Sequence, residues 1–262
     1  MITLSQGQLN LLETCPRKFQ HICLDQLMSP PTPEQQERLL WGNRFHLLMQ
    51  QHEMGLAIAT LFADDRDPLQ QSVATFTRTV PDLFAADDAT HRQSEHRRTL
   101  EFHGYVLTVV YDLLILEPHS AQILDWKTYP RPQTRHWLAE NWQTRLYPFV
   151  LAETSEYAPE QIAMTYWFVQ PDADDADQPQ SMRFDYSAAQ YESDRHTLTQ
   201  RLDQLSQWLE DYTQGGAFPQ VAAATGRCQS CSFAVRCQRH SEPQSSLAED
   251  ALDLDSIPEV QL

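Results

Sequence analysis

A hairpin of two apolar strands that ends in charged residues constrains this sequence more than any other feature. Residues 105–128 read YVLTVVYDLLILEPHSAQILDWKT: two aliphatic runs joined by the turn-like EPHSA. Asp112 lies in the first run, and Asp125 and Lys127 end the second. Lysine is rare in this chain, since only Lys18 and Lys127 are found among 19 basic residues. The pattern predicts buried strands that carry charges at one defined place.

The two acids and the lysine have two readings. Adjacent antiparallel strands can bring Asp112 and Asp125 together, and two buried carboxylates are costly unless something balances their charge. Mg²⁺ or Mn²⁺ would do so, because both prefer hard oxygen ligands. Lys127 faces the same side of its strand as Asp125, where it can place a water or offset phosphoryl charge. The alternative is a buried salt bridge without a metal.

The rest of the chain predicts an α/β protein. Helical periodicity runs through 34–55, 135–153 and 187–215, and 162–171 forms another strand. The N-terminal region is expected to be helical, with Ser5 as an N-cap. Residues 241–262 carry six acids and no Lys or Arg, which predicts a disordered tail.

The net charge of −17 weighs against a nucleic-acid partner if it is spread evenly. Its distribution weakens that argument, because the tail and the stretch 171–178 together hold ten acids and no base. A locally basic groove therefore stays open as an interpretation. No apolar run approaches the length of a membrane span and no signal peptide opens the chain, so a cytoplasmic protein without a membrane partner is expected.

Five cysteines in a chain without an export signal argue against a disulfide framework. Cys228, Cys231 and Cys237 follow a C-x2-C-x5-C pattern that suits one metal centre, and Cys15, which precedes Pro16, is the candidate for a fourth ligand. The spacing alone does not separate structural Zn²⁺ from an iron–sulfur cluster. Cys23 is then left over as a buried thiol.

Four motifs, taken together, resemble one family. Asp112 with Asp125-Trp126-Lys127 resembles the catalytic signature of the PD-(D/E)XK nuclease superfamily, in its RecB-like branch. GNRFHLLMQ at 42–50 is similar to that branch's Gly-x-x-x-His helix, and QTRLY at 143–147 is similar to its Gln-x-x-x-Tyr helix. The opening LSQGQLNLLETCPRKF is similar to its Ser-x-x-x-Leu and Cys-Pro-x-x-Phe start. The resemblance implies a restriction-endonuclease-like core with a mixed central sheet flanked by helices.

The resemblance also implies roles for single residues. The Mg²⁺ or Mn²⁺ ligands would be His46, Asp112, Asp125 and the backbone carbonyl of Trp126. Lys127 would orient the attacking water or offset the developing negative charge. Gln143 and Tyr147 would contact DNA or support the lysine. Glu95 resembles an acid that often precedes the Asp112 motif, but it also reads as a solvated strand-end residue. One departure is Val109, where the family often has glycine.

The cysteines extend the resemblance. Iron–sulfur members of this branch, such as AddB-type nuclease domains and CRISPR spacer-acquisition exonucleases, use one N-terminal and three C-terminal cysteines. By analogy a [4Fe–4S] cluster on Cys15, Cys228, Cys231 and Cys237, or Zn²⁺ in its place, would close a nuclease domain over residues 1–240. Residues 241–262 would form the tail.

The function expected from these features is a metal-dependent deoxyribonuclease, specifically an exonuclease. Its substrate would be single-stranded or end-opened DNA in repair, recombination or CRISPR-related processing. A helicase or a repair or CRISPR protein would be its partner, because the chain has no Gly-x-x-x-x-Gly-Lys-Ser/Thr motif. The alternative is a catalytically silent DNA-binding or scaffold subunit of a repair complex.

Overall fold

The structure is a computed structural model that describes residues 1–27, 32–56, 68–84, 90–129, 131–132, 134–169 and 180–239. The chain divides into two compact units, Met1–Pro219 and Gln220–Leu262, and each is described by itself. The acidic stretch 171–178 and the tail 241–262 lie outside the described residues. The disordered tail and the domain boundary at residue 240 therefore stay predictions.

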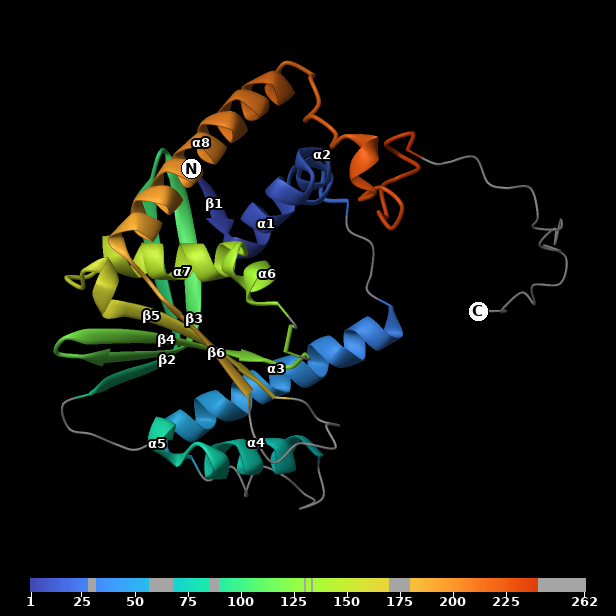
Figure 1. The fold of residues 1–262 in the computed structure, drawn as a ribbon. Helices are drawn as coiled ribbons and strands as arrows, with labels where there is room; N and C mark the ends of the chain where they lie inside the picture. The colour runs from blue at the N-terminus through green and yellow to red at the C-terminus, as the bar shows by residue number, and fades with distance from the viewer. Residues whose placement is uncertain are drawn as a thin grey trace, which may run out of the picture. The chain divides into compact units, whose positions relative to one another are not determined.

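The first unit is built on one six-stranded mixed sheet (Figure 1). Its strands run in the order β1-β3-β4-β5-β6, and β2 pairs with β3. The β1–β3 and β4–β5 pairs are parallel and the others are antiparallel. The strands are β1 (Ile2–Ser5), β2 (His91–Phe102), β3 (Tyr105–Glu117), β4 (Ser120–Lys127), β5 (Ile162–Phe168) and β6 (Gln180–Asp185).

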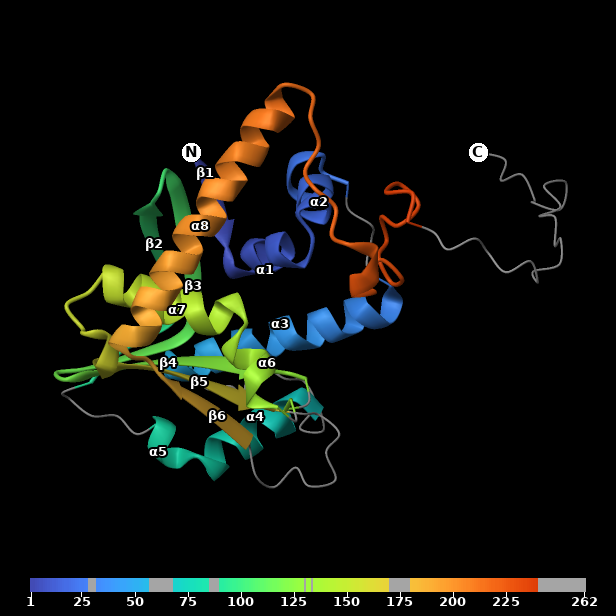
Figure 2. The ribbon, with the colours of Figure 1, turned by 45° about the horizontal axis from the view of Figure 1, so that its top comes forward.

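Helices cover both faces of this sheet. Figures 1 and 2 show α7 on one side of the strands and α3 with α4 on the other. None of the helices in the described part of the chain is long and apolar enough to span a membrane. The helices of this unit are α1 (Gln6–Thr14), α2 (Pro16–Phe19), η1 (Gln20–Leu24), α3 (Pro33–Glu53), α4 (Pro68–Thr79), α5 (Pro81–Phe84), α6 (Arg135–Ala139), α7 (Trp142–Glu153), η3 (Pro159–Gln161) and α8 (Ala188–Thr213).

Local sequence sets where the main helices begin and end. The Thr32 hydroxyl accepts a hydrogen bond from the Gln35 backbone N–H and starts α3, with Pro33 in the first turn. Asn141 caps α7 by accepting from the Gln143 N–H, and Ser187 caps α8 in the same manner. Past the end of α8, Gly215 takes φ +88°, a left-handed conformation that glycine adopts without strain.

Two apolar cores fill the space between the sheet and its helices. The larger one joins α1, α7 and α8 to the sheet and includes Leu107, Tyr111, Leu114 and Ile123. The smaller one joins α3 and α4 to the opposite face; its members from β3 and β4 are Leu113, Ile115, Leu124 and Trp126. Along β3, Tyr111 therefore packs into one core and Leu113 into the other. The alternation of the strand changes face at the residue between them, which is Asp112.

One edge of β3 is shared by two strands. β1 pairs with Tyr105–Thr108, and β4 pairs with Leu113–Glu117. Residues 109–112 lie between these two pairings, at a fork in the sheet. The fork matters for function because Asp112 is its last residue and Asp125 follows the last β4 residue in the pairing, Leu124.

The predicted fold class is confirmed: the protein has a mixed central sheet flanked by helices. The predicted helices at 34–55, 135–153 and 187–215 and the strand at 162–171 each have a counterpart. The helical N-terminal region needs one correction, because the short strand β1 precedes α1. Strand β6 was missed as well, since QSMRFD is short, half polar and at the sheet edge.

The second unit contains little regular structure among its described residues. A single 3₁₀ turn, η4 (Ala223–Thr225), precedes a series of turns that carries the three C-terminal cysteines. The Gln220 side chain holds the two ends of this segment together: its amide donates to the Cys237 carbonyl at 3.3 Å and accepts from Arg239 Nε at 2.7 Å.

A buried ion pair fastens α7 to α8. Arg145 Nε donates to Asp194 Oδ1 at 2.6 Å, and the Asp194 side chain is 1% exposed. The Gln190 amide and the Tyr186 hydroxyl donate to the same carboxylate. Asp194 is thus fully hydrogen-bonded, which is the condition under which a buried charge is tolerated.

Replacing this carboxylate should destabilise the fold. Asp194→Ala leaves the Arg145 guanidinium buried without its counter-charge, so we expect the free energy of unfolding to fall by about 3–5 kcal/mol. Urea denaturation measures this. The control is Asp185→Ala, which removes the exposed partner of Arg183 and should cost no more than about 1 kcal/mol. Equal losses in the two variants would contradict the prediction.

Candidate active site

Three carboxylates lie at one level across β2, β3 and β4. In the β2–β3 register Ser94 faces Leu113 and His96 faces Tyr111, so Glu95 and Asp112 occupy the same level. The last β3–β4 pair in register is Leu113 with Leu124, which places Asp125 beside Asp112 at the fork. Like charges on neighbouring strands repel, so this row needs cations around it.

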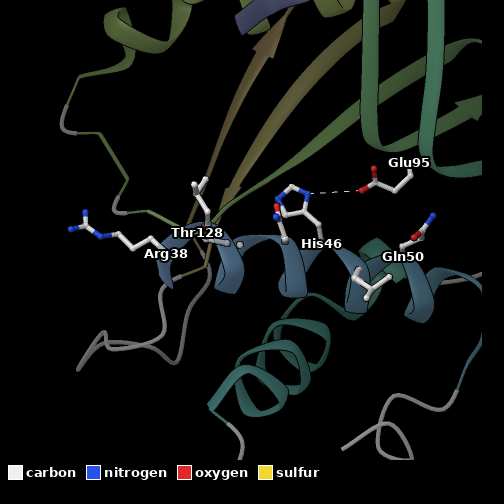
Figure 3. A pocket seen from close by; sticks show the side chains of 9 residues that line it. Arg38, His46, Gln50, Glu95 and Thr128 are labelled. Atoms are coloured by element: carbon white, nitrogen blue, oxygen red, sulfur yellow. Dashed lines mark ion pairs between the residues drawn. The ribbon is translucent and has the colours of Figure 1, made fainter. Parts of the chain in front are cut away.

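His46, on α3, is one group that can balance these carboxylates, because its imidazole can carry a positive charge or bind a metal ion. Its Nε2 lies 3.1 Å from the Trp126 carbonyl, which can only accept, so Nε2 carries a hydrogen and donates it. Its Nδ1 lies 3.3 Å from Asp112 Oδ1 and 4.0 Å from Glu95 Oε1. Figure 3 shows the ring reaching from α3 toward Glu95. Burial lowers the pKa of His46, but the Asp112 hydrogen bond and charge outweigh that effect and raise it.

Glycine lets α3 approach the end of β4 closely enough for His46 to reach the strand. A Cβ on Gly42 would lie 3.2 Å from Thr128 Oγ1, just beyond Lys127. His46 is one helical turn further on and so lies on the same face of α3. The spacing of glycine and histidine in GNRFH therefore has a steric reason. The small Gly42 allows α3 to lie close to the end of β4, and at this distance His46 reaches the Trp126 carbonyl.

Asp112 connects β3 to β4 where their pairing ends. Its Oδ2 accepts a hydrogen bond from the Trp126 backbone N–H at 2.7 Å, while its Oδ1 faces His46. The side chain thus takes the place of a strand partner and satisfies a backbone donor at the fork. One carboxylate oxygen is used for structure, and the other is directed at the cluster.

Glu95 has an unusual backbone conformation for a strand residue. Its φ is +49°, in the left-handed region that residues other than glycine rarely adopt. Such conformations cost of order 1–3 kcal/mol and concentrate at functional sites. Burial and the nearby Asp112 charge raise the pKa of Glu95, while His46 opposes the rise. The sequence left the role of Glu95 open, and only the tertiary structure brings it to His46.

Asp125, Lys127 and Gln143 form a second group, on the α7 side of the sheet. Lys127 Nζ lies 2.6 Å from Asp125 Oδ2 and donates to Gln143 Oε1 at 2.8 Å, and Gln143 Nε2 donates to Asp125 Oδ1 at 2.5 Å. Burial raises the pKa of Asp125 to about 6, although the Lys127 charge pulls it down. Burial lowers the pKa of Lys127, but Asp125 more than compensates, so the ammonium stays protonated.

Tyr147, on α7, lies at the fork in the sheet. A hydrogen bond from the Val110 backbone reaches its phenol oxygen, and the Gln143 side chain interacts with the same oxygen. Burial, together with the charges of Asp125 and Asp112, keeps the pKa of Tyr147 far above its usual range, so the hydroxyl is always protonated. Val110 lies in the stretch between the β1 and β4 pairings, so Tyr147 contacts the backbone in this gap.

The donor set of the first group suits a divalent cation. One ligand atom each from His46, Glu95 and Asp112 lies within 4.8 Å of the others. Imidazole nitrogen with carboxylate oxygens is a combination that Mn²⁺ accepts, and the carboxylates suit Mg²⁺. Of the sequence-predicted ligands, His46 and Asp112 belong to this group. Asp125 lies with Lys127, and the Trp126 carbonyl accepts from the opposite nitrogen of His46.

A pocket of about 570 Å³ opens beside the cluster. It lies between α3, β2 and the end of β4, and both His46 and Glu95 line it (Figure 3). The other residues around it are Arg38, Leu39, Gly42, Asn43, Leu47, Gln50 and Thr128. A substrate group in this pocket would therefore have direct access to the cation ligands.

A mixed sheet carries an Asp–Lys pair next to a histidine–carboxylate cluster in this protein. A model of the PD-(D/E)XK nuclease superfamily matches residues 3–238, and the chain belongs to this superfamily. Its members act on DNA with divalent metals. A search of curated proteins found no match.

Two solved structures are similar to this chain. One is a protein of Eubacterium rectale described as a "Putative exonuclease", with 11% identity and a TM-score of 0.54 over 93% of this chain and 91% of that one. At this identity the likeness concerns the fold alone. The other is SSO0001, with 14% identity over 91% of this chain and 87% of that one, but its TM-score of 0.39 is too low to compare folds.

Removing the Gln143 amide should destabilise the buried group. Gln143→Leu keeps the size of the side chain but takes one hydrogen bond from Lys127 and one from Asp125. We expect the free energy of unfolding to fall by about 2–4 kcal/mol, because both charged partners stay buried. Chemical denaturation of the metal-free protein measures it. Gln204→Leu, on the exposed face of α8, is the control and should change stability by less than about 0.5 kcal/mol.

Proposed function

We propose that this protein is a catalytically active Mg²⁺- or Mn²⁺-dependent deoxyribonuclease of the RecB-like branch, and that it degrades DNA from single-stranded or opened ends. The observation that carries the proposal is the fixed Lys127 ammonium, held by Asp125 and Gln143 next to a histidine–carboxylate cluster. In a catalytically silent relative the Asp125–Lys127 pair would be a structural salt bridge, and the cleavage assay below distinguishes the two roles.

Each residue has a role in this proposal. His46 and Asp112 hold the divalent cation, and the resemblance adds Asp125 and the Trp126 carbonyl as ligands. When bound, the cation supplies Lewis-acid stabilisation of the scissile phosphate and lowers the pKa of a water. Lys127 donates a hydrogen bond to that water or to a phosphate oxygen, and Asp125 and Gln143 fix its position.

Tyr147 has a supporting role in the proposed reaction. It keeps the fork open by binding the Val110 backbone and Gln143, so β4 presents Asp125 and Lys127 in one orientation. Because the phenol stays protonated, it contributes no charge to the site. We assign Tyr147 and Gln143 as positioning residues for Lys127.

The pocket beside the cluster favours an unpaired strand as substrate. Arg38 offers a guanidinium at its rim, which suits phosphate. Leu39 and Leu47 line the same pocket yet are 59% and 51% exposed, and apolar side chains can lie against the faces of unpaired bases. Strand separation would come from a partner, and we propose a helicase or a repair or CRISPR protein for that task.

The nuclease proposal is tested on labelled single-stranded DNA with Mn²⁺ or Mg²⁺. We expect Asp125→Ala and Lys127→Ala each to lower the cleavage rate by at least about a hundredfold, since removal of one transition-state contact has that effect. Lys18→Ala, at the only other lysine, and Asp203→Ala, on the exposed face of α8, are the matched controls and should cleave normally.

The outcome also decides between the enzyme and its alternative. Folded wild-type protein that binds DNA but does not cleave it with either metal would favour the silent DNA-binding or scaffold subunit. Cleavage that survives in Asp125→Ala would point to a contaminating nuclease. A duplex with one single-stranded end, compared with a closed circle, distinguishes an exonuclease from an endonuclease.

We also propose a [4Fe–4S] cluster on Cys15, Cys228, Cys231 and Cys237, with structural Zn²⁺ as the alternative occupant. Within the first unit, the Arg17 backbone N–H donates to the Pro219 carbonyl at 3.0 Å, and Arg17 Nε donates to the Phe218 carbonyl. The Phe218 and Pro219 carbonyls, which precede Cys228 in the chain, are thus hydrogen-bonded to Arg17, two residues after Cys15. No disulfide joins the cysteines, all of which lie in described residues.

Metal analysis of anaerobically purified protein tests the cysteine proposal. We expect about four irons and four sulfides per chain, the content of one such cluster. Cys15→Ser should lose the iron, whereas Cys23→Ser should keep it, because Cys23 is outside the proposed set. One zinc per chain in place of iron would show that the site holds structural Zn²⁺. Metal retained in Cys15→Ser would show that Cys15 is not a ligand.

A further inference from the structure

The α3 side of the sheet is covered over only part of its length. Along β3, the core on the α7 side takes alternate residues up to Tyr111, whereas the core on the α3 side begins at Leu113. Figure 1 shows β1 near one end of β3 and α3 with α4 near the other, so the two helices cover only the second end. The β3 residues that point to the α3 side at the first end are half-buried and belong to neither core: Val106, Thr108 and Val110.

Strand β2 extends this surface with exposed polar side chains. In the β2–β3 register Arg97 faces Val110 and Thr99 faces Thr108. Directly opposite residues point to the same side of a sheet, so Arg97 and Thr99 lie on the α3 side, and both are exposed. Arg98, between them, points the other way and donates to the end of α7. We call the following residues the open face: Arg97, Thr99, Val106, Thr108 and Val110.

The open face continues directly from the histidine–carboxylate cluster. Glu95 comes two residues before Arg97 on β2, and Asp112 comes two residues after Val110 on β3, a step of about 7 Å along each strand. Glu95 also lines the pocket beside His46. A polymer whose scissile group lies at the cluster therefore has the open face as its next contact surface.

Arg97 carries a charge that the described residues leave unpaired. Its neighbours on β2 are engaged: Arg92 donates to both Glu53 oxygens at 2.7 and 2.9 Å, and Arg98 donates to the last turn of α7. For the Arg97 side chain, the described part of the chain contains neither an ion pair nor a hydrogen bond. A free guanidinium next to a site that would hold a phosphodiester is suited to a neighbouring phosphate.

From this placement we infer that the open face binds the backbone of the DNA strand next to the scissile phosphate, and that Arg97 holds the adjacent phosphate. The inference rests on the proposed function and gives its substrate a path. Thr99 and Thr108 supply hydroxyl donors to phosphate oxygens, a contact that positions a strand without reading its sequence. Glu101, exposed on the same side of β2, repels phosphate and marks where the path leaves the sheet.

The first experiment measures binding of a short labelled oligo(dT) by fluorescence anisotropy with Mn²⁺, in a Lys127→Ala background in which we expect the DNA to stay intact. We expect Arg97→Gln to weaken binding at least about fivefold, because one phosphate loses its guanidinium. The dependence of log Kd on log salt should also become shallower by about 0.7, the share of one phosphate contact with a single strand.

The matched control is Arg183→Gln, which removes the same charge from an exposed residue of β6 and should bind as its parent does. An equal loss of affinity in both variants would reveal a general effect of net charge. Unchanged binding by Arg97→Gln would show that no phosphate reaches the open face. Either result would overturn the inference.

The second experiment leaves Arg97 in place and adds a negative charge to the open face. We expect Thr99→Glu, in an otherwise wild-type protein, to raise KM for oligo(dT) at least about fivefold and to leave kcat nearly unchanged. The new carboxylate repels the bound strand, while the cluster and Lys127 are untouched. Ser181→Glu, at an exposed position of β6, is the control. An unchanged KM, or the same rise in both variants, would place the strand elsewhere.

The failure of this inference differs from the failure of the proposed function. DNA binding that depends on Arg97, together with no cleavage by the wild type, would contradict the nuclease proposal and leave the strand path in place. Cleavage by the wild type, with normal binding by Arg97→Gln and a normal KM for Thr99→Glu, would remove the strand path alone.

Discussion

The division of one edge of β3 between two strands is the constraint on which the site depends. β1 ends beside Thr108 and β4 begins its pairing at Leu113, so the backbone between them cannot be satisfied by a continuous ladder. Side chains complete it instead: Tyr147 binds the Val110 backbone, and Asp112 accepts from the Trp126 N–H. Because these polar groups are needed at the fork for structural reasons, the sheet can place charged residues there at little extra cost.

Charge balance then explains why the site has two halves. On the α7 side, the Lys127 ammonium and the Gln143 amide satisfy Asp125. On the α3 side, the ion-pair partner that Asp112 and Glu95 share among the described residues is the imidazole of His46, and a neutral imidazole does not balance two carboxylates. The deficit of positive charge on this side is what a divalent cation would fill. The protein thus fixes Lys127 with its own residues, whereas the charge on the α3 side would be balanced by a bound cation.

Much of this arrangement could be predicted from the sequence, and the remainder could not for identifiable reasons. The β3–β4 hairpin and the shared face of Asp125 and Lys127 follow from aliphatic runs and a period of two. Gln143 and Tyr147 could be placed on one helix face by their spacing. Glu95 could not be assigned, because alternation in HRQSEHRR gives no sign of a left-handed residue. The change of face at Asp112 was equally hidden, since Tyr111 and Leu113 are both apolar. Strands β1 and β6 were missed because four to six residues of mixed polarity carry too weak a pattern.

The acidity of the chain is compatible with a DNA substrate once the position of the charges is considered. A phosphate diester in the pocket would meet Glu95, with Asp112 behind the His46 ring, and without a cation the two carboxylates would repel it. A bound divalent ion would neutralise the two carboxylate charges, and the same carboxylates would hold the ion. From this electrostatic argument we expect the cation to bind before the strand, and Arg38 at the rim of the pocket adds its own attraction for phosphate. The net charge of −17 adds to this dependence on the cation, because a chain with such a charge offers polyanions little general attraction if the charge is spread evenly.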